Sequence, residues 1–398
     1  MNSVPGKSPA PSSPEAQRRL AYFNDRKDEI VSTIRELVEI ESPSDNKSAA
    51  NRMADFIANK FSQLGGEVRF HPARDFGNHL EINFAGKSTA KPILLLGHYD
   101  TVYPLGTLAT MPCRILGDKM SGPGVLDMKS GIALMLYALA ALQDWQEEAG
   151  HGGLPRPVTV LLVSDEEVGS ESSREITESL AKQSAAVLVI EPAHGPKGAV
   201  KSARKGVGDY IVKVTGKASH AGLDFQRGVN AILELARQIE KISSLTDLKK
   251  GLTVNVGIVS GGSRSNVVPA EAEAQVDVRI ERLKDAAGID KKIRSLRPFN
   301  RKCKIEVSGG INRPPMERTA GVEALFRQAS AIARDLGWEL GEAAVGGGSD
   351  GNFTASLGIP TLDGLGGVGD GAHAPHEHIL ISELPRRAAL LAGMIEAV

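Results

Sequence analysis

The strongest constraint on the fold is a series of short apolar runs separated by segments of helical periodicity. The runs cover residues 93–96, 158–163 and 186–190, with a weaker one at 359–362. Residues 131–142, between the first two runs, are apolar nearly all round, as expected for a helix buried against a sheet. Strands spaced by helices indicate an α/β sheet with a parallel portion. We therefore expect a layered α/β unit.

The middle of the chain follows a different pattern. Strand-like and helical segments occur in the order β-α-β-β-α-β, over residues 210–215, 229–242, 252–259, 272–280, 283–293 and 303–307. That order is the ferredoxin-like arrangement. Because the first pattern resumes after residue 317, we expect this block to be inserted into the first unit. The predicted division is 16–206 with 315–398 for the first unit and 207–314 for the insertion.

The N-terminal region is predicted to contain a tail and two helices. Residues 1–15 hold four prolines and four serines and no apolar stretch like the core of a signal peptide, so we expect a disordered tail. Apolar residues recur at helical spacing over 15–40 and again over 46–61, which predicts two amphipathic helices.

Composition narrows the classes of function. Lys plus Arg total 47 against 48 Asp plus Glu, so the net charge of -1 gives no field that would attract nucleic acid or anionic lipid. Cys113 and Cys303 are far apart in sequence, which argues against a disulfide framework and against thiolate zinc sites. No apolar run approaches the roughly 20 residues needed to span a bilayer. We expect a cytoplasmic protein with no nucleic-acid partner and no membrane partner.

Polar side chains gather where the strands of the first unit are expected to end. His98 follows the first apolar run, an acidic turn at 165–167 follows the second, and Glu191 follows the third. In open α/β sheets, ligands lie beyond the carboxyl ends of the strands, so these residues should converge on one crevice. Two loops are expected to reach the same place, a glycine-rich one with Asp127 and a late one with His373.

The collected side chains form a candidate metal site. They are two imidazoles and three carboxylates with no thiolate, namely His98, Asp127, Glu167, Glu191 and His373. Nitrogen and oxygen ligands without sulfur suit catalytic zinc, or manganese or cobalt in its place. Five ligands are too many for one tetrahedral zinc, but they suit two metals bridged by a carboxylate, for which Asp127 is the candidate. Asp100 is placed to accept the other ring N–H of His98.

Six ordered motifs resemble a known family. The segments HYDTV, GPGVLDMKSG, SDEEVGS, VIEP, GKASHAG and SNVVPAEAEAQVDVR precede a late GGGSD and a terminal histidine loop. With them the chain resembles the M20 metallopeptidases, and within that family the glutamate carboxypeptidase branch, over nearly its whole length after the tail. The resemblance implies a two-zinc catalytic domain over 16–206 and 315–398, interrupted by a lid domain over 207–314 through which the protein forms a homodimer.

The resemblance also implies roles for the metal-site residues. It would make His98 and Glu191 ligands of separate zinc ions and Asp127 the bridge, with Glu167 and His373 as the remaining ligands and Glu166 as the general base. His376 and His378 lie close to His373 in the sequence, and His373 fits the family spacing, four residues before Glu377.

Three residues of the inserted domain are candidates for substrate contact. The resemblance places a substrate-binding arginine at Arg279, in the AQVDVR segment. We expect it to recognise the substrate's α-carboxylate, because a guanidinium offers a bidentate fork to a carboxylate, and a surface ion pair is the alternative. Asn266 is expected to be the polar neighbour of Arg279. The resemblance implies that His220 reaches the site of the partner subunit, where it would donate a hydrogen bond to the oxyanion.

These observations favour a zinc-dependent hydrolase that releases a C-terminal amino acid, glutamate by preference, from a small peptide or N-acyl substrate. Glu166 would take a proton from the attacking water. An N-acyl-amino-acid deacylase or desuccinylase of the same family is the alternative, and a non-catalytic binding protein ranks below both. Taken singly, residues 165–167 could be a solvated acidic turn and Asp127 a helix cap. Their expected convergence favours the enzyme.

Overall fold

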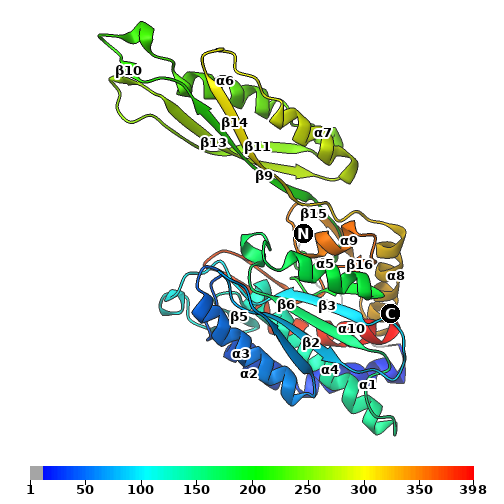
Figure 1. Ribbon diagram of the computed structural model, residues 1–398. Coiled ribbons are helices and arrows are strands. Elements are labelled where there is room, and N and C mark those ends of the chain that lie inside the picture. The colour runs from blue at the N-terminus through cyan, green and yellow to red at the C-terminus, as the bar shows by residue number, and fades with distance from the viewer. Residues whose placement is uncertain (1–11) are drawn as a thin grey trace, which may run out of the picture. The chain divides into compact units, whose positions relative to one another are not determined.

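The computed structural model describes residues 12–398, which form two units (Figure 1). Unit 1 comprises the described residues up to Ser202 together with Arg318–Ala344 and Ser349–Val398, and unit 2 comprises Ala203–Glu317 and Val345–Gly348. The division predicted from the sequence differs from this one by a few residues at each junction. It also lacks Val345–Gly348, a short segment that returns to unit 2.

The chain begins in unit 1 with three helices, α1 (Pro14–Asp25), α2 (Lys27–Val38) and α3 (Lys47–Gln63). Residues 1–11 of the expected tail lie outside the described part of the chain, and the expectation is wrong for Pro14 and Glu15, because the Ser13 hydroxyl caps α1. The single helix predicted over 15–40 is also wrong. It breaks at Arg26, whose φ of -100° and ψ of 10° end α1, and the acidic first turn of α2 then favours a new start.

A six-stranded sheet forms the centre of unit 1, in the order β1-β2-β6-β3-β7-β16. The strands β6, β3, β7 and β16 are mutually parallel, and β1 and β2 add an antiparallel edge. This confirms the predicted layered α/β fold with a parallel portion. The bounds are β1 (Glu67–His71), β2 (His79–Phe84), β3 (Ile93–His98), β6 (Val158–Val163), β7 (Ala186–Val189) and β16 (Thr361–Leu362).

Helices cover both faces of this sheet. Alternation along β3 directs Leu95 into the large core that includes α4 (Ser130–Glu148) and α10 (Leu384–Ala397), whereas Leu94 and Leu96 face α5 (Arg174–Gln183). The remaining helices of the unit are α8 (Ala320–Asp335) and α9 (Gly351–Ser356).

Helix α4 is longer than the segment 131–142 predicted from the sequence. Together with the turn before it, it spans Val125–Glu148, which is long and apolar enough to cross a membrane. However, 78% of its apolar window is buried inside the protein. The helix therefore has the burial of a core helix.

Two smaller sheets complete unit 1. One has the order β17-β18-β5-β4 and holds the late histidine loop between β17 (Gly369–Asp370) and β18 (His378–Leu380). Its other strands are β4 (Arg114–Leu116) and β5 (Lys119–Ser121). The second sheet pairs β8 (Val200–Arg204) with β15 (Glu342–Val345).

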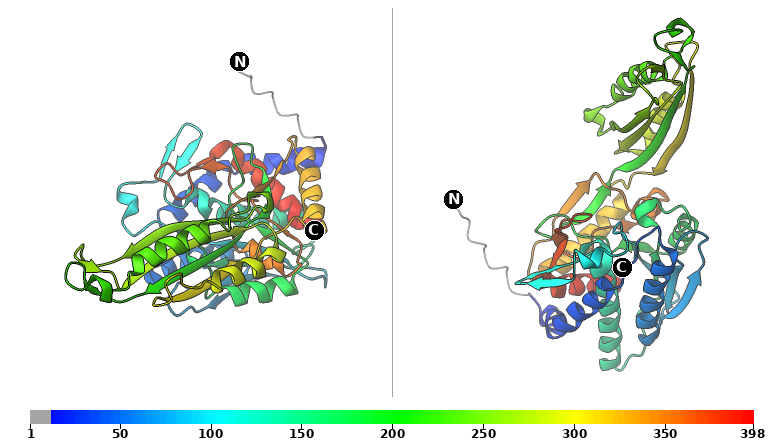
Figure 2. Two further views of the ribbon diagram at one scale, coloured as in Figure 1. Left: turned by 90° about the horizontal axis from the view of Figure 1, so that it is seen from above. Right: turned by 90° about the vertical axis from the view of Figure 1, so that its left-hand side faces the viewer.

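Unit 2 has the predicted β-α-β-β-α-β order. Its antiparallel sheet has the order β11-β13-β9-β14, and both helices pack on one face around a separate apolar core (Figure 2). The elements are β9 (Gly206–Thr215), α6 (Ala231–Ser243), β11 (Thr253–Gly261), β13 (Glu271–Ile280), α7 (Leu283–Arg294) and β14 (Lys304–Arg313). A short ribbon of β10 (Ser219–His220) and β12 (Val267–Val268) extends from it.

Candidate active site

Two predicted ligands, His98 and Glu191, meet at the carboxyl edge of the central sheet. His98 ends β3, and Glu191 follows the neighbouring parallel strand β7, in which Val189 lies opposite Leu96. Parallel strands in register bring the residues at their ends together, and His98 Nε2 lies 3.3 Å from Glu191 Oε1. This contact favours a single metal ion for the two residues over the separate ions that the resemblance implies.

Asp127 lies between this pair and a second pair. It belongs to the turn η2 (Val125–Lys129) that leads into α4. Its Oδ1 is 3.1 Å from His98 Nε2, and its Oδ2 is 3.4 Å from His373 Nε2. The same His373 nitrogen is 3.1 Å from Glu167 Oε1. One carboxylate thus faces a histidine and a glutamate on each side, which is the arrangement expected of a bridging ligand.

His373, rather than His376, makes the contacts expected of the late histidine. It lies in the loop between β17 and β18 with a φ of 62°, in the left-handed region that non-glycine residues seldom adopt. His376 is exposed, and its backbone carbonyl accepts a hydrogen bond from the ring of His378. The loop therefore directs a single imidazole toward Asp127 and Glu167.

Glu377 holds the Asp127 turn in place, and it was not among the predicted site residues. Its buried carboxylate accepts hydrogen bonds from the backbone N–H groups of Gly124, Leu126 and Asp127, at 3.2, 2.8 and 3.0 Å. The Tyr103 hydroxyl donates to it at 2.6 Å. Because Glu377 lies in the loop that carries His373, it links the position of one candidate ligand to that of another. A carboxylate four residues after His373 was the signal in the sequence.

Asp100 connects His98 to the acidic turn η3 (Glu166–Val168). The Asp100 carboxylate accepts the backbone N–H groups of Glu166 at 3.3 Å and Glu167 at 3.2 Å, and the Ser44 hydroxyl at 2.7 Å. His98 Nδ1 is 3.0 Å from the Asp100 backbone carbonyl and 3.4 Å from its carboxylate. The predicted partner of the ring is therefore the right residue, and its carbonyl is the nearer acceptor.

Glu166 and Glu167 lie on different sides of the site. Ligand atoms of His98, Glu166 and Glu191 fall within 4.8 Å of one another, and so do those of His98, Asp127 and Glu167. Glu167 also contacts His373, as described above. Glu166 therefore lies near His98 and Glu191, whereas Glu167 lies near His98, Asp127 and His373.

Neighbouring carboxylates raise the pKa values of both histidines in the cluster. Burial alone would lower the pKa of His98, but the carboxylates of Asp100, Asp127 and Glu191 outweigh it and raise that pKa well above its usual range. Hydrogen bonds to Asp127 and Glu167 raise the pKa of His373 to about 10. Burial raises the pKa of Glu167. A divalent cation would have to displace the ring protons, and the sulfur-free donor set suits zinc, cobalt or manganese.

The three candidate residues of unit 2 do not come together within one chain. His220 and Asn266 are neighbours, because the Ala221 N–H donates to the Asn266 carbonyl at 2.9 Å beside the β10–β12 ribbon. Arg279 lies near the far end of β13, opposite Val207. At about 3.3 Å per residue, the length of β13 separates it from that ribbon. The expectation that Asn266 adjoins Arg279 is therefore wrong within a subunit.

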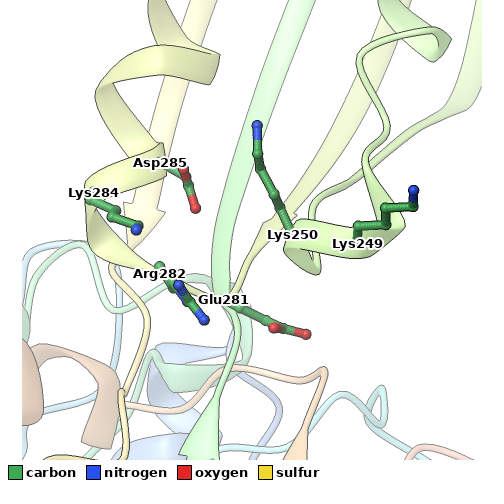
Figure 3. Close-up of a pocket in the computed structure, with 6 residues that line it drawn as sticks. All are labelled: Lys249, Lys250, Glu281, Arg282, Lys284 and Asp285. Carbon is green, nitrogen blue, oxygen red and sulfur yellow. The ribbon is translucent and has the colours of Figure 1, made fainter.

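Unit 2 also contains a cavity of about 190 Å³ that none of the predicted site residues lines (Figure 3). Side chains of both charges surround it, from the turn η5 (Leu248–Lys250) and from the start of α7. Lys250 pairs with Asp247 at 3.3 Å and Glu281 with Lys205 at 3.6 Å. We assign no role to this cavity.

The family model for peptidase family M20/M25/M40 matches residues 94–397. Carboxypeptidase G2 of Pseudomonas sp. (strain RS-16) is 32% identical over 378 residues, which are 93% of this chain and 89% of that protein.

Solved structures share the fold. Aminopeptidase PepT of Bacillus cereus superposes with a TM-score of 0.74 and 22% identity, over 93% of this chain and 98% of the other. A dinuclear metal-binding peptidase of the M20 family from Bacillus subtilis superposes with a TM-score of 0.67 and 15% identity, over 94% and 98% of the two chains.

Proposed function

Because the chain belongs to peptidase family M20/M25/M40 and is thus a metal-dependent peptidase, we propose that it removes a C-terminal amino acid, preferentially glutamate, from a small peptide or N-acyl substrate. Two zinc ions per subunit are the proposed cofactors, with cobalt or manganese as substitutes. The proposed setting is the cytoplasm, without a nucleic-acid or membrane partner.

The placement of Asp127 carries this proposal. Its two oxygens face separate pairs of ligands, His98 with Glu191 and His373 with Glu167. Each side therefore offers one imidazole nitrogen and two carboxylate groups, counting the shared one. Three protein ligands per metal leave a position for water or substrate, as in catalytic rather than structural zinc sites. This geometry supports a two-metal hydrolase.

Glu166 is the proposed general base. When bound, the metal pair would polarise the scissile carbonyl and lower the pKa of the attacking water. Glu166 would accept a proton from that water and deliver it to the leaving nitrogen, as a positioned carboxylate can. Its place beside His98 and Glu191 supports this role. The Asp100 carboxylate would fix the position of the η3 turn by accepting hydrogen bonds from the backbone N–H groups of Glu166 and Glu167.

Arg279 is the proposed carboxylate receptor. Asp277 accepts hydrogen bonds from its Nε at 3.0 Å and its Nη2 at 2.7 Å, which orients the guanidinium plane. These hydrogen bonds leave the Nη1 group of Arg279 to bind a substrate carboxylate. Asn266, exposed beside His220, is the proposed second polar contact.

His220 is the proposed oxyanion donor in the partner subunit. Its Nδ1 accepts the backbone N–H groups of Gly222 and Leu223, both at 3.1 Å, so the neutral ring carries its proton on Nε2 and can donate there. In the same loop, Leu223 and Phe225 are 82% and 66% exposed. Large exposed apolar side chains mark interaction surfaces, which supports contact with a second subunit in a homodimer.

A substrate panel tests the proposal. Purified protein loaded with zinc, cobalt or manganese would be assayed on N-acyl glutamates, on α- and γ-linked dipeptides ending in glutamate, and on their C-terminal amides. We expect cleavage of the free acids and little of the amides, and Arg279→Lys should weaken binding of the acids more than of the amides. Preference for the acyl group over the released residue would favour a deacylase or desuccinylase. Metal binding without cleavage of any compound would favour a binding protein.

A further inference from the structure

Arg387 is a buried charged residue outside the metal cluster. It lies in α10 and is 1% exposed. Its guanidinium donates to three backbone carbonyls, from Nε to Gly366 at 2.8 Å, from Nη1 to Gly198 at 3.0 Å and from Nη2 to Gly364. Glu383 interacts with it electrostatically but forms its ion pair with Arg386. Burial lowers the pKa of Arg387 to about 9, and burying a charge costs free energy.

The three carbonyls belong to two loops beside candidate ligands. Gly364 and Gly366 lie between β16 and β17, and β17 in turn precedes the loop that carries His373. Gly198 lies in the segment that follows Glu191. These loops are joined by backbone hydrogen bonds, from the Gly366 N–H to the Glu191 carbonyl and from the Ala193 N–H to the Gly367 carbonyl, both at 2.9 Å. Arg387 therefore holds together two segments that meet at Glu191.

Gly366 couples the Arg387 contacts to Glu191, because Gly366 packs directly against the backbone of Ile190 and Glu191. A Cβ atom at position 366 would lie 2.4 Å from the Ile190 carbonyl oxygen and 2.8 Å from that of Glu191. The Gly364–Gly367 loop thus has little freedom to move without displacing Glu191. Its position is fixed on the other side by the guanidinium.

We propose that Arg387 is a positioning residue for the metal site, which fixes the backbone of Glu191 through the Gly364–Gly367 segment. The inference rests on the proposed ligand role of Glu191. Mutation of a residue that orients a metal ligand without binding the metal typically lowers metal affinity by about 10–100-fold. We expect an effect of about that size, larger at the Glu191 side of the site than at the Glu167 side.

Metal titration of substituted proteins tests the inference. Arg387→Met removes the charge at similar length, and Arg387→Lys keeps the charge but cannot reach all three carbonyls. Arg386→Met is the matched control, since Arg386 neighbours it in α10 and pairs instead with Glu383. Zinc affinity and stoichiometry would be measured by competition with a chromophoric chelator, with circular dichroism as the check of folding. We expect one weakened site in both Arg387 variants and wild-type affinities in the control.

Kinetics separate positioning from a general structural defect. With excess zinc, kcat of Arg387→Lys should recover while KM stays near the wild-type value. A folded Arg387 variant that binds two metals as tightly as the wild type would overturn the inference, and Arg387→Lys serves for this if Arg387→Met does not fold. A wild-type protein that fails to bind two metals would instead refute the proposed function.

Discussion

Glu166 and Glu167 are adjacent in the chain, and their side chains have different neighbours. Glu167 contacts His373, and the contacts of Glu166 place it by His98 and Glu191. We predict that Glu166→Ala lowers kcat by at least about 10²-fold, as loss of a general base does, and keeps two metals. Glu167→Ala should lose or weaken one metal. Metal analysis of both purified variants decides, and equal metal loss in the two would contradict the assignment of Glu166 as a base that is not a metal ligand.

His79 should make the stability of the fold sensitive to acid. It is 1% exposed, and burial lowers its pKa, so it stays neutral when the unfolded chain, with a pKa of about 6.5, takes up a proton. The free energy of unfolding should therefore fall as the pH drops below about 6.5, by at most about 1.4 kcal/mol per pH unit. Urea unfolding between pH 7.5 and 5.5 measures this slope.

The matched variants for this measurement are His79→Gln and His151→Gln. His79→Gln should flatten the slope, whatever its effect on absolute stability, because the titrating ring is gone. His151 is exposed, and its replacement should leave the slope unchanged. An unaltered slope in His79→Gln would show that another group is responsible.

At the residue scale, the sequence predicted which side chains gather at the candidate metal site better than it predicted which of them are neighbours. His98, Glu167 and Glu191 were found because each follows an apolar run, and parallel strands end at one edge. Their pairing depended on strand order, since β3 lies between β6 and β7, and one sequence does not reveal that order. Glu377 and Arg387 bind backbone N–H and carbonyl groups, and only Glu377 had a signal in the sequence, its spacing of four residues from His373.

Among the elements, α3 offers a test of local stability. The Asn46 side chain accepts the backbone N–H of Ala49 at 2.9 Å and caps this helix. We predict that Asn46→Ala lowers the free energy of unfolding by about 1 kcal/mol, whereas Asn46→Asp, which keeps an acceptor, loses much less. Denaturant unfolding gives both values. The capping role is wrong if the aspartate variant is as unstable as the alanine variant.

Strand β2 shows why one central element was not predicted from the sequence. The buried strand β2 carries His79 and Glu81, and Glu81 is satisfied by a contact of 2.7 Å with His71 on β1. Polar residues in a buried strand hide its apolar pattern, and the pairing that satisfies them is visible only in three dimensions. The four parallel strands had apolar runs, the last of them weak, and the two helices and four longer strands of unit 2 had recognisable periodicity, so these elements were predicted. The short strands β10 and β12 were not.

For the whole molecule, subunit exchange tests whether His220 acts across a dimer. Glu166→Ala and His220→Ala proteins should each be nearly inactive, the second by roughly 10²–10³-fold. Each mixed dimer would have one site with both defects and one with neither. After random exchange half the dimers are mixed, so about a quarter of the wild-type activity should return.

The control is exchange of each variant with itself, which should restore nothing. Formation of mixed dimers can be followed with differently tagged subunits. If mixed dimers form and the mixture stays inactive, His220 serves its own chain or has no catalytic part.

If Asp127 is shared by two metal ions, the binding affinities of the two ions depend on each other. Since Asp127 faces both pairs of ligands, an ion that binds on one side also alters the charge and position of a ligand on the other. By linkage, whatever factor the first ion applies to the affinity of the second, the second applies to the first. A chelator that removes one ion should therefore change the affinity of the protein for the other ion. The two ions should then bind and dissociate in a coupled way and not independently.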